Sequence, residues 1–331
     1  MAAPPPSYTK VTHAATYAGI TPTQPGLSTM GKVVLITGAS GGIGRATALS
    51  FAASGPKALI LLGRRADALA ETASIVKASY TGLQLQTYEA ELCDPSGVRS
   101  AMNNVAADFG GIDILVHAAG VLAPVETLLE ADPTTFLNGY KTTVVGTLVT
   151  AQSVVLANKD KSVTFVNLTT AGILFPPFPG MGAYVSSKMA AVKLLEAFAA
   201  ENLQVRLHNV HPGLLKTAMS TKLEEKVKLP YAYDDSKNTP ILSLVANMST
   251  IEVTNHSFSL IVSLPADFLV WIASPEAEFL KNKIVFSSWD VEELKGRKKE
   301  ILGGPPGTGE LWIGYTGFPR FMAGQALPGR G

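Results

Sequence analysis

The sequence predicts an α/β fold in which a doubly wound parallel sheet carries helices on both faces. Short apolar runs alternate with segments of helical spacing, and a glycine-rich turn joins the first run to the first helical segment. Alternating strands and helices form βαβ units, which give parallel strands and right-handed crossovers. We expect strands over residues 32–36, 58–62, 83–88, 112–117, 162–167, 205–210 and 284–286. We expect helices over residues 43–54, 67–79, 95–109, 133–157, 184–201 and 264–273.

The composition indicates a well-buried chain and excludes several classes of protein. Of the 331 residues, 47% are hydrophobic and 16% charged, and the net charge is +1. Disorder requires low hydrophobicity and high net charge, and nucleic-acid binding requires basic clusters, so neither is expected. The single cysteine, Cys93, excludes an internal disulfide and a cysteine-rich metal site. We recognise no secretory signal and no membrane helix, so we expect a cytoplasmic protein. We also expect no bound metal.

The glycine-rich turn runs from Thr37 to Gly44 and reads TGASGGIG. Gly38, Gly42 and Gly44 let the backbone turn sharply and approach a pyrophosphate closely. The helix that follows offers unpaired N–H groups at its N-terminus. The required strand precedes this string and the required helix follows it. It therefore predicts a Rossmann-type dinucleotide site, the alternative being a turn that binds nothing.

The end of the second strand carries Arg64 and Arg65 and no acidic residue. Dinucleotide folds that prefer NAD hold the ribose 2′-hydroxyl with a carboxylate near this point, whereas an arginine suits a 2′-phosphate. The sequence therefore favours NADP (NADPH) over NAD. The alternative is that both arginines are merely solvated.

Tyr184 and Lys188 form a Y-x-x-x-K pair, one turn apart on the same face of a predicted helix. A free tyrosine, with a pKa of about 10, is a poor acid–base group at neutral pH. A neighbouring ammonium group stabilises the phenolate and lowers that pKa. We expect Tyr184 to be a proton donor and Lys188 to tune its pKa.

These strings together resemble the classical short-chain dehydrogenase/reductase (SDR) family over about residues 31–290. The string from Trp289 to Leu294 and the N-terminal arm resemble a fungal subset, many of whose members serve secondary metabolism. The resemblance implies that the cofactor is held by Gly38, Ser40, Gly42, Ile43, Gly44, Arg64, Arg65, Glu91, Leu92, Ala119, Gly120, Tyr184, Lys188, Pro212, Gly213 and Thr217.

Four positions depart from the family pattern. His117 and Ala118 stand where the family has the two asparagines of N-N-A-G, and we interpret His117 as structural. Thr170 stands at the serine that holds the substrate oxygen, with Thr169 as a second candidate. Thr143 replaces the helical asparagine that supports a proton relay to the lysine. The implied catalytic set is Tyr184, Lys188, Thr170 and Thr143.

We divide the chain into three parts. Residues 1–30 form an extended arm, or alternatively a disordered tail. Residues 31–302 form a single NAD(P)-binding domain with a substrate lid around residues 214–265, and residues 303–331 form a C-terminal tail. Apolar residues suggest a pocket for a bulky substrate: Leu174, Phe175, Phe178, Met181, Leu214, Leu215 and Met219.

The predicted function is NADP-dependent reduction of a ketone or imine, or oxidation of the corresponding alcohol. Its partner is a small-molecule substrate, with neither nucleic acid nor membrane, and the resemblance implies a homo-oligomer, a dimer or tetramer. The threonine departures motivate a non-redox alternative: an isomerase, dehydratase or cyclase, or a protein that keeps NADP for structure.

Overall fold

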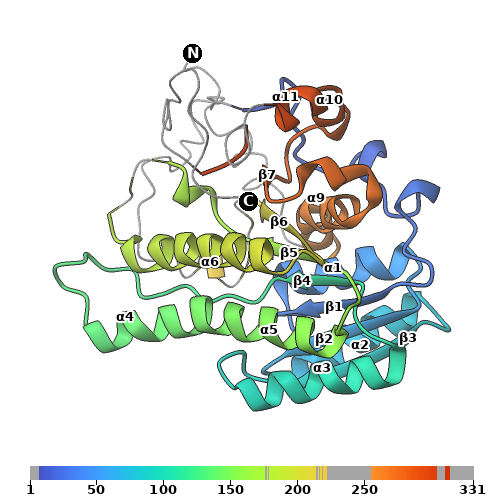
Figure 1. The fold of residues 1–331 in the computed structure, drawn as a ribbon, viewed down its shortest axis with the longest axis horizontal. Coiled ribbons are helices and arrows are strands. Elements are labelled where there is room, and N and C mark those ends of the chain that lie inside the picture. Colours follow the sequence, from blue (N-terminus) through green and yellow to red (C-terminus); the bar gives the residue numbers. More distant parts are fainter. Residues whose placement is uncertain are drawn as a thin grey trace.

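The computed structural model describes residues 7–175, 177, 179–213, 215, 217, 219–221, 255–303 and 310–313. At its centre lies a seven-stranded parallel sheet in the order β3-β2-β1-β4-β5-β6-β7 (Figure 1). This confirms the predicted fold class. The strands are β1 Val33–Thr37, β2 Ala58–Gly63, β3 Gln84–Glu89, β4 Ile114–His117, β5 Val163–Leu168, β6 Val205–His211 and β7 Ile284–Phe286.

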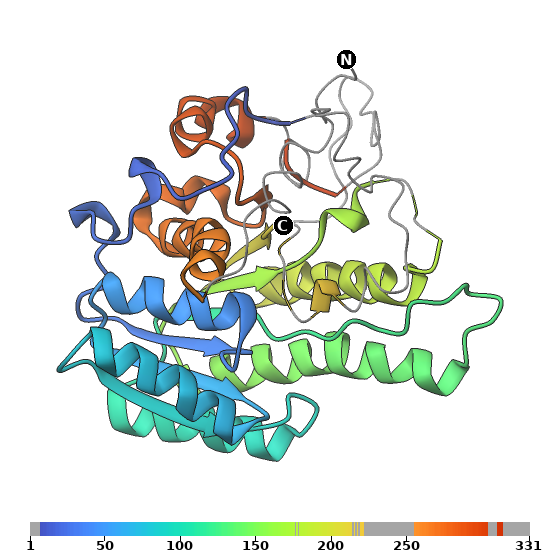
Figure 2. The same cartoon turned by 180° about the vertical axis from the view of Figure 1, so that it is seen from behind.

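Helices cover both faces of the sheet, because successive strand residues point to opposite sides. Val34 and Ile36 of β1 belong to one core, whereas Val33 and Leu35 belong to the other. Figure 1 shows α3 Pro95–Phe109, α5 Gly146–Asn158 and α6 Gly182–Glu201 on the near face. Figure 2 shows α1 Gly42–Ala53, α2 Ala66–Ser79 and α9 Asn255–Ala273 on the opposite face.

The helix expected over residues 133–157 is interrupted in the structure. It consists of α4 Pro133–Tyr140, a π-helical turn η3 Lys141–Val145, and α5. Two physical features explain the break. The β-branched run from Thr142 to Val145 has low helix propensity. Gly146 also lies so close to Leu92 that a Cβ there would be 2.9 Å from the Leu92 Cβ.

The region after β6 differs from the expected lid. Helix α9 begins at Asn255, inside the range 214–265, and it packs against α1. Residues 222–254, with most of the predicted lid, lie outside the described part of the chain. Beyond α9 follow η6 Pro275–Leu280, β7, α10 Val291–Gly296 and α11 Lys298–Leu302. None of the described helices is long and apolar enough to cross a membrane.

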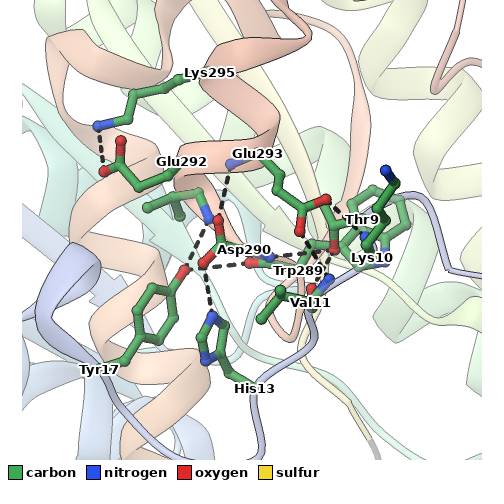
Figure 3. Close-up of polar contacts among 11 residues, drawn as sticks. Thr9, Lys10, Val11, His13, Tyr17, Trp289, Asp290, Glu292, Glu293 and Lys295 are labelled. Carbon is green, nitrogen blue, oxygen red and sulfur yellow. Dashed lines mark hydrogen bonds and ion pairs between the residues drawn. The ribbon is translucent and has the colours of Figure 1, made fainter.

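The described part of the N-terminal arm is packed onto the domain rather than forming a disordered tail. Its short turns η1 Ala18–Ile20 and η2 Pro25–Leu27 bury Ile20 and Leu27 almost completely. Figure 3 shows the arm against the start of α10. There the His13 ring lies 2.8 Å from the Asp290 carboxylate, and the Val291 N–H donates to the Tyr17 hydroxyl at 2.9 Å.

Asp290 joins two elements, so we predict that its replacement destabilises both. Its carboxylate caps α10 by accepting from the Glu293 N–H at 2.8 Å, and it also pairs with His13. Asp290→Ala should lower the free energy of unfolding by about 1–2 kcal/mol, because the cap and the arm contact are both lost. Urea denaturation measures this. The control Asp290→Asn keeps the cap, so equal stability of all three proteins would contradict the assignment.

Candidate active site

The glycine-rich turn forms a cradle that side chains would fill. A Cβ at Gly38 would lie 2.7 Å from the Ala119 Cα, and a Cβ at Gly44 only 2.2 Å from the Gly38 carbonyl oxygen. Gly38 and Gly42 also have left-handed φ angles of +69° and +51°. Gly41 gives α1 no side-chain cap, and its first turn holds no acidic residue. The helix N-terminus is therefore suited to an anionic pyrophosphate.

A cleft of about 580 Å³ opens beside this turn. It brings together most of the predicted cofactor residues: Gly38, Ser40, Gly42, Ile43, Gly44, Arg64, Arg65, Glu91, Leu92, Ala119, Gly120 and Thr217. Tyr184, Lys188, Pro212 and Gly213 are not among its lining residues. Sequence reasoning missed Thr142, which reaches the cleft from the π turn and belongs to no recognised motif.

The two arginines at the end of β2 have different partners. A terminal nitrogen of Arg65 lies 3.4 Å from the Ser40 carbonyl oxygen and 3.5 Å from its hydroxyl, beside the glycine-rich turn. Arg64 instead lies 3.8 Å from the Glu91 carboxylate. Arg64 is thus partly neutralised, whereas no carboxylate pairs with Arg65 among the described residues.

Tyr184 and Thr170 face each other. The Thr170 side chain lies near enough to the Tyr184 phenol to lower the pKa of that tyrosine. The Thr170 hydroxyl accepts from the Gly172 N–H at 3.2 Å, which holds the turn η4 Ala171–Ile173. Thr169 differs, because its hydroxyl is buried without a partner and its N–H donates to the Val210 carbonyl within the sheet. Of the two candidate threonines, Thr170 is the one placed beside the tyrosine.

Lys188 is buried, with 8% of its surface exposed, and its ammonium group donates to the Leu168 carbonyl at 2.9 Å. Burial lowers the pKa of Lys188 to about 8. Burial raises the pKa of Tyr184, and only the Thr170 hydrogen bond opposes that rise. The predicted lowering of the Tyr184 pKa by Lys188 is therefore wrong for this structure, in which the lysine is held against β5.

Thr143 does not offer its side chain to the site. Its hydroxyl is buried without a partner, while its backbone carbonyl accepts from the Thr147 hydroxyl at 2.5 Å. Thr217 lies over the glycine-rich turn, because its methyl carbon would be 3.7 Å from a Cβ at Gly42. Its hydroxyl accepts from the Ser220 N–H at 3.2 Å and keeps its own proton for a further acceptor.

The end of β6 supports the segment that carries Thr170. The His211 ring accepts from the Ala171 N–H at 3.1 Å, and burial lowers the pKa of His211 to about 4, so the ring is neutral. Gly213, two residues later, has a left-handed φ of +91°. Pro212 and Gly213 thus directly follow a residue that is bonded to Ala171, the neighbour of Thr170 in the chain.

A second cavity, which we name the aromatic chamber, has a volume of about 350 Å³. The rings of Phe286 and Trp289 are stacked in it, with centroids 4.7 Å apart, and His211 meets Phe286 edge-on at 4.8 Å. The predicted pocket residues Leu174 and Phe175 line it, whereas Met219 lines the cofactor cleft and Phe178 and Leu214 lie outside the described residues. The full lining is Ser7, Tyr8, Leu174, Phe175, Ile284, Phe286, Trp289, Leu311 and Trp312.

Comparison with known proteins identifies the family. The model of the short chain dehydrogenase family matches residues 32–228, more than half of the chain. The chain belongs to the short-chain dehydrogenase family. This membership makes it an oxidoreductase that acts on CH–OH and C=O groups of small molecules with a nicotinamide dinucleotide, NAD or NADP.

Its similar proteins include fungal enzymes. Short chain dehydrogenase citE of Monascus ruber is 31% identical over 301 residues, covering 88% of this chain and 92% of that protein. Short chain dehydrogenase/reductase nsrO of Aspergillus novofumigatus is 28% identical, covering 90% and 93%. The fold also resembles levodione reductase, with a TM-score of 0.64, 21% identity, and coverage of 78% of this chain and 96% of that one. A Shigella flexneri short chain dehydrogenase complexed with NADP gives a TM-score of 0.62 at 21% identity, covering 80% and 99%.

The residues of the cleft suit the dinucleotide that the family uses. The glycine cradle leaves room for it, and the open N-terminus of α1 would hold its pyrophosphate. Arg64 and Arg65 lie at the rim of the same cleft. Among the described residues, no three histidine, cysteine, aspartate or glutamate side chains gather as metal ligands.

The buried Lys188 predicts an alkaline limit for carbonyl reduction. Its ammonium group is present below about pH 8 and is lost above it, so kcat/KM for reduction should fall as the pH rises through about 8. A pH profile measured with a turned-over ketone checks this. An arginine at position 188 stays charged across the whole pH range, so any residual activity of Lys188→Arg should not fall as the pH rises through about 8. A wild-type profile that stays flat through the alkaline range would contradict the prediction.

Proposed function

We propose that this enzyme is an NADP-dependent reductase of a ketone or imine on a bulky, apolar substrate, or catalyses the reverse oxidation, in fungal secondary metabolism. The observation that carries the proposal is the hydroxyl pair of Tyr184 and Thr170, with Lys188 one helical turn from the tyrosine. A cytoplasmic location and a homo-oligomeric state remain predictions.

The residues divide the chemistry between them. The bound dinucleotide supplies or accepts the hydride at carbon. As negative charge develops on the carbonyl oxygen, Tyr184 gives that oxygen its phenolic proton and Thr170 donates a hydrogen bond to it. The raised pKa of Tyr184, caused by burial, keeps the phenol protonated at neutral pH. This favours reduction, because reduction begins with a protonated donor.

Lys188 stabilises the deprotonated form of Tyr184, which lies one helical turn away on α6. Its ammonium group, held by the Leu168 carbonyl, becomes the nearby positive charge once Tyr184 loses its proton. Its nitrogen also lies 3.4 Å from where a Cβ of Gly120 would be, at the edge of the cofactor cleft. Lys188 is therefore well placed to bind a hydroxyl of the cofactor ribose as well.

The aromatic chamber supports a bulky, apolar substrate. Its volume lies within the usual range of small-molecule sites, and its lining is dominated by aromatic and aliphatic side chains. Leu174 and Phe175 come from the segment directly after Thr170 and remain 45% and 41% exposed. An apolar substrate would cover these side chains while its carbonyl oxygen meets Thr170.

A cofactor-oxidation screen tests the reductase proposal. NADPH and, separately, NADH are offered with bulky ketones, quinones and imines. We expect NADPH consumption by the wild type and by Thr169→Val. Tyr184→Phe should lose roughly a hundredfold or more in kcat, because it lacks the proton donor. Thr170→Val should also lose activity. Unchanged turnover by Tyr184→Phe would refute the assigned role, and NADPH binding without turnover of any compound would favour the non-redox alternative.

The cofactor preference predicts a difference between the two arginines. Arg65→Ala should weaken NADPH binding by about tenfold or more while leaving NADH binding nearly unchanged, because a charge-assisted bond to the 2′-phosphate is lost. Arg64→Ala is the matched control, since Glu91 already pairs with that arginine. Isothermal titration calorimetry with both nucleotides measures the effect. Equal weakening of NADPH and NADH by Arg65→Ala would rule out 2′-phosphate recognition.

A further inference from the structure

His117 occupies a central position that neither the fold nor the cofactor cleft explains by itself. It is the last residue of β4, is only 3% exposed, and pairs with Thr37 of β1 in the sheet. Its ring reaches two different elements. The Nδ1 atom lies 3.1 Å from the Thr37 hydroxyl, and the Nε2 atom lies 3.1 Å from the hydroxyl of Thr147 on α5.

The neighbouring bonds fix the direction of every proton in this group. The single hydroxyl proton of Thr147 goes to the Thr143 carbonyl at 2.5 Å, so Thr147 must accept from His117 Nε2–H. A neutral ring protonated at Nε2 accepts at Nδ1, and Thr37 donates there. Thr37 in turn accepts from the Ala119 N–H at 3.2 Å. The result is one continuous chain from the cofactor edge of the sheet to the π turn.

The surroundings keep this ring uncharged. Burial, and then the positive charge of Lys188, lower the pKa of His117 to about 3. Both ring nitrogens are hydrogen-bonded, and the residue is not among those that line the cofactor cleft. His117 therefore has no free proton or lone pair to offer to a substrate, and it can influence the reaction only through the residues it holds.

The far end of the chain is the π turn η3. This turn brings Thr142 to the cofactor cleft and packs against α6, the helix of Tyr184 and Lys188. The Thr143 side chain does not anchor the turn, because its hydroxyl has no partner. The Thr143 carbonyl, through Thr147, links the turn to the sheet.

We infer that His117 is a positioning residue for the redox reaction. Its neutral imidazole ties the π turn to the edge of β1 and β4, and so fixes Thr142 and α6 relative to the bound nucleotide. The Nε2–H tautomer is essential, because only this form donates to Thr147 while it accepts from Thr37. The inference rests on the oxidoreductase family and not on the identity of the carbonyl substrate.

A double-mutant cycle on NADPH affinity tests the inference without a known substrate. His117→Phe keeps a ring and loses both bonds, and Thr147→Val removes the acceptor. Each substitution should raise the NADPH Kd roughly tenfold. The double variant should bind NADPH no more weakly than the weaker-binding single variant, because both substitutions interrupt the same chain of hydrogen bonds. Thr150→Val is the matched control: it loses a buried hydroxyl that bonds only the Gly146 carbonyl, at 2.7 Å, and should bind like the wild type. Wild-type affinity in Thr147→Val, or losses that multiply in the double variant, would overturn the inference.

A measurement on the wild-type protein covers the case in which His117→Phe fails to fold. Nitrogen-15 NMR of labelled histidine reports which ring nitrogen carries the proton. We expect the His117 ring to stay in the Nε2–H form from about pH 5 to pH 9, because its pKa is about 3. A ring protonated at Nδ1, or one that titrates within this range, would contradict the chain of bonds. With any ketone that is turned over, kcat should fall more than the substrate KM rises in Thr147→Val.

Discussion

The close approach of the β1–α1 turn to the end of β4 is the constraint on which the rest of the structure depends. Gly38 touches the backbone of Ala119, and Gly44 touches Gly38, at distances that exclude any Cβ. β1 and β4 are the neighbours at which the order of strands reverses, and the crevice of a doubly wound sheet opens at such a point. The contact also places Gly120 next to Lys188. The glycine-rich turn, the end of β4 and Lys188 therefore meet at one closely packed point of the backbone.

Burial governs the charges at this corner. Lys188, His117 and Tyr184 are all shifted toward their neutral forms, and burial is the largest cause for each. A second charge could not be accommodated: a protonated His117 would stand beside the ammonium of Lys188 in a medium that screens poorly. Because the His117 ring stays neutral, Lys188 is the one of these three residues that can carry a positive charge near neutral pH. The phenol of Tyr184 stays protonated at neutral pH, because burial raises its pKa.

Much of this could be predicted from the sequence, because local patterns decide it. All seven strands, the glycine-rich turn and the Tyr184–Lys188 pair were predictable, since apolar runs and glycine spacings reflect backbone requirements that leave few alternatives. The burial of Ile20 and the aromatic chamber were not, because each depends on residues far apart in the chain. The π turn was missed as well, because the local β-branched run combines there with the approach of Leu92 to Gly146, which the sequence does not reveal. The prediction of a lowered Tyr184 pKa was wrong for a similar reason. Helical spacing shows that a lysine is near, but it cannot show that the lysine is held by Leu168 or how far the tyrosine is buried.

The departures at residues 143 and 170 can be judged from the same contacts. Thr170 retains a hydroxyl, and its side chain lies near enough to Tyr184 to lower the pKa of that tyrosine. Thr143 loses an amide, yet the turn is held through its backbone carbonyl and Thr147, so the substitution leaves the local geometry supported. A protein that kept NADP only for structure would need the cleft and the glycine cradle, but not a hydroxyl pair with a buried lysine beside it. The substitutions therefore change how these segments are supported, while Tyr184, Lys188 and a hydroxyl at residue 170 remain.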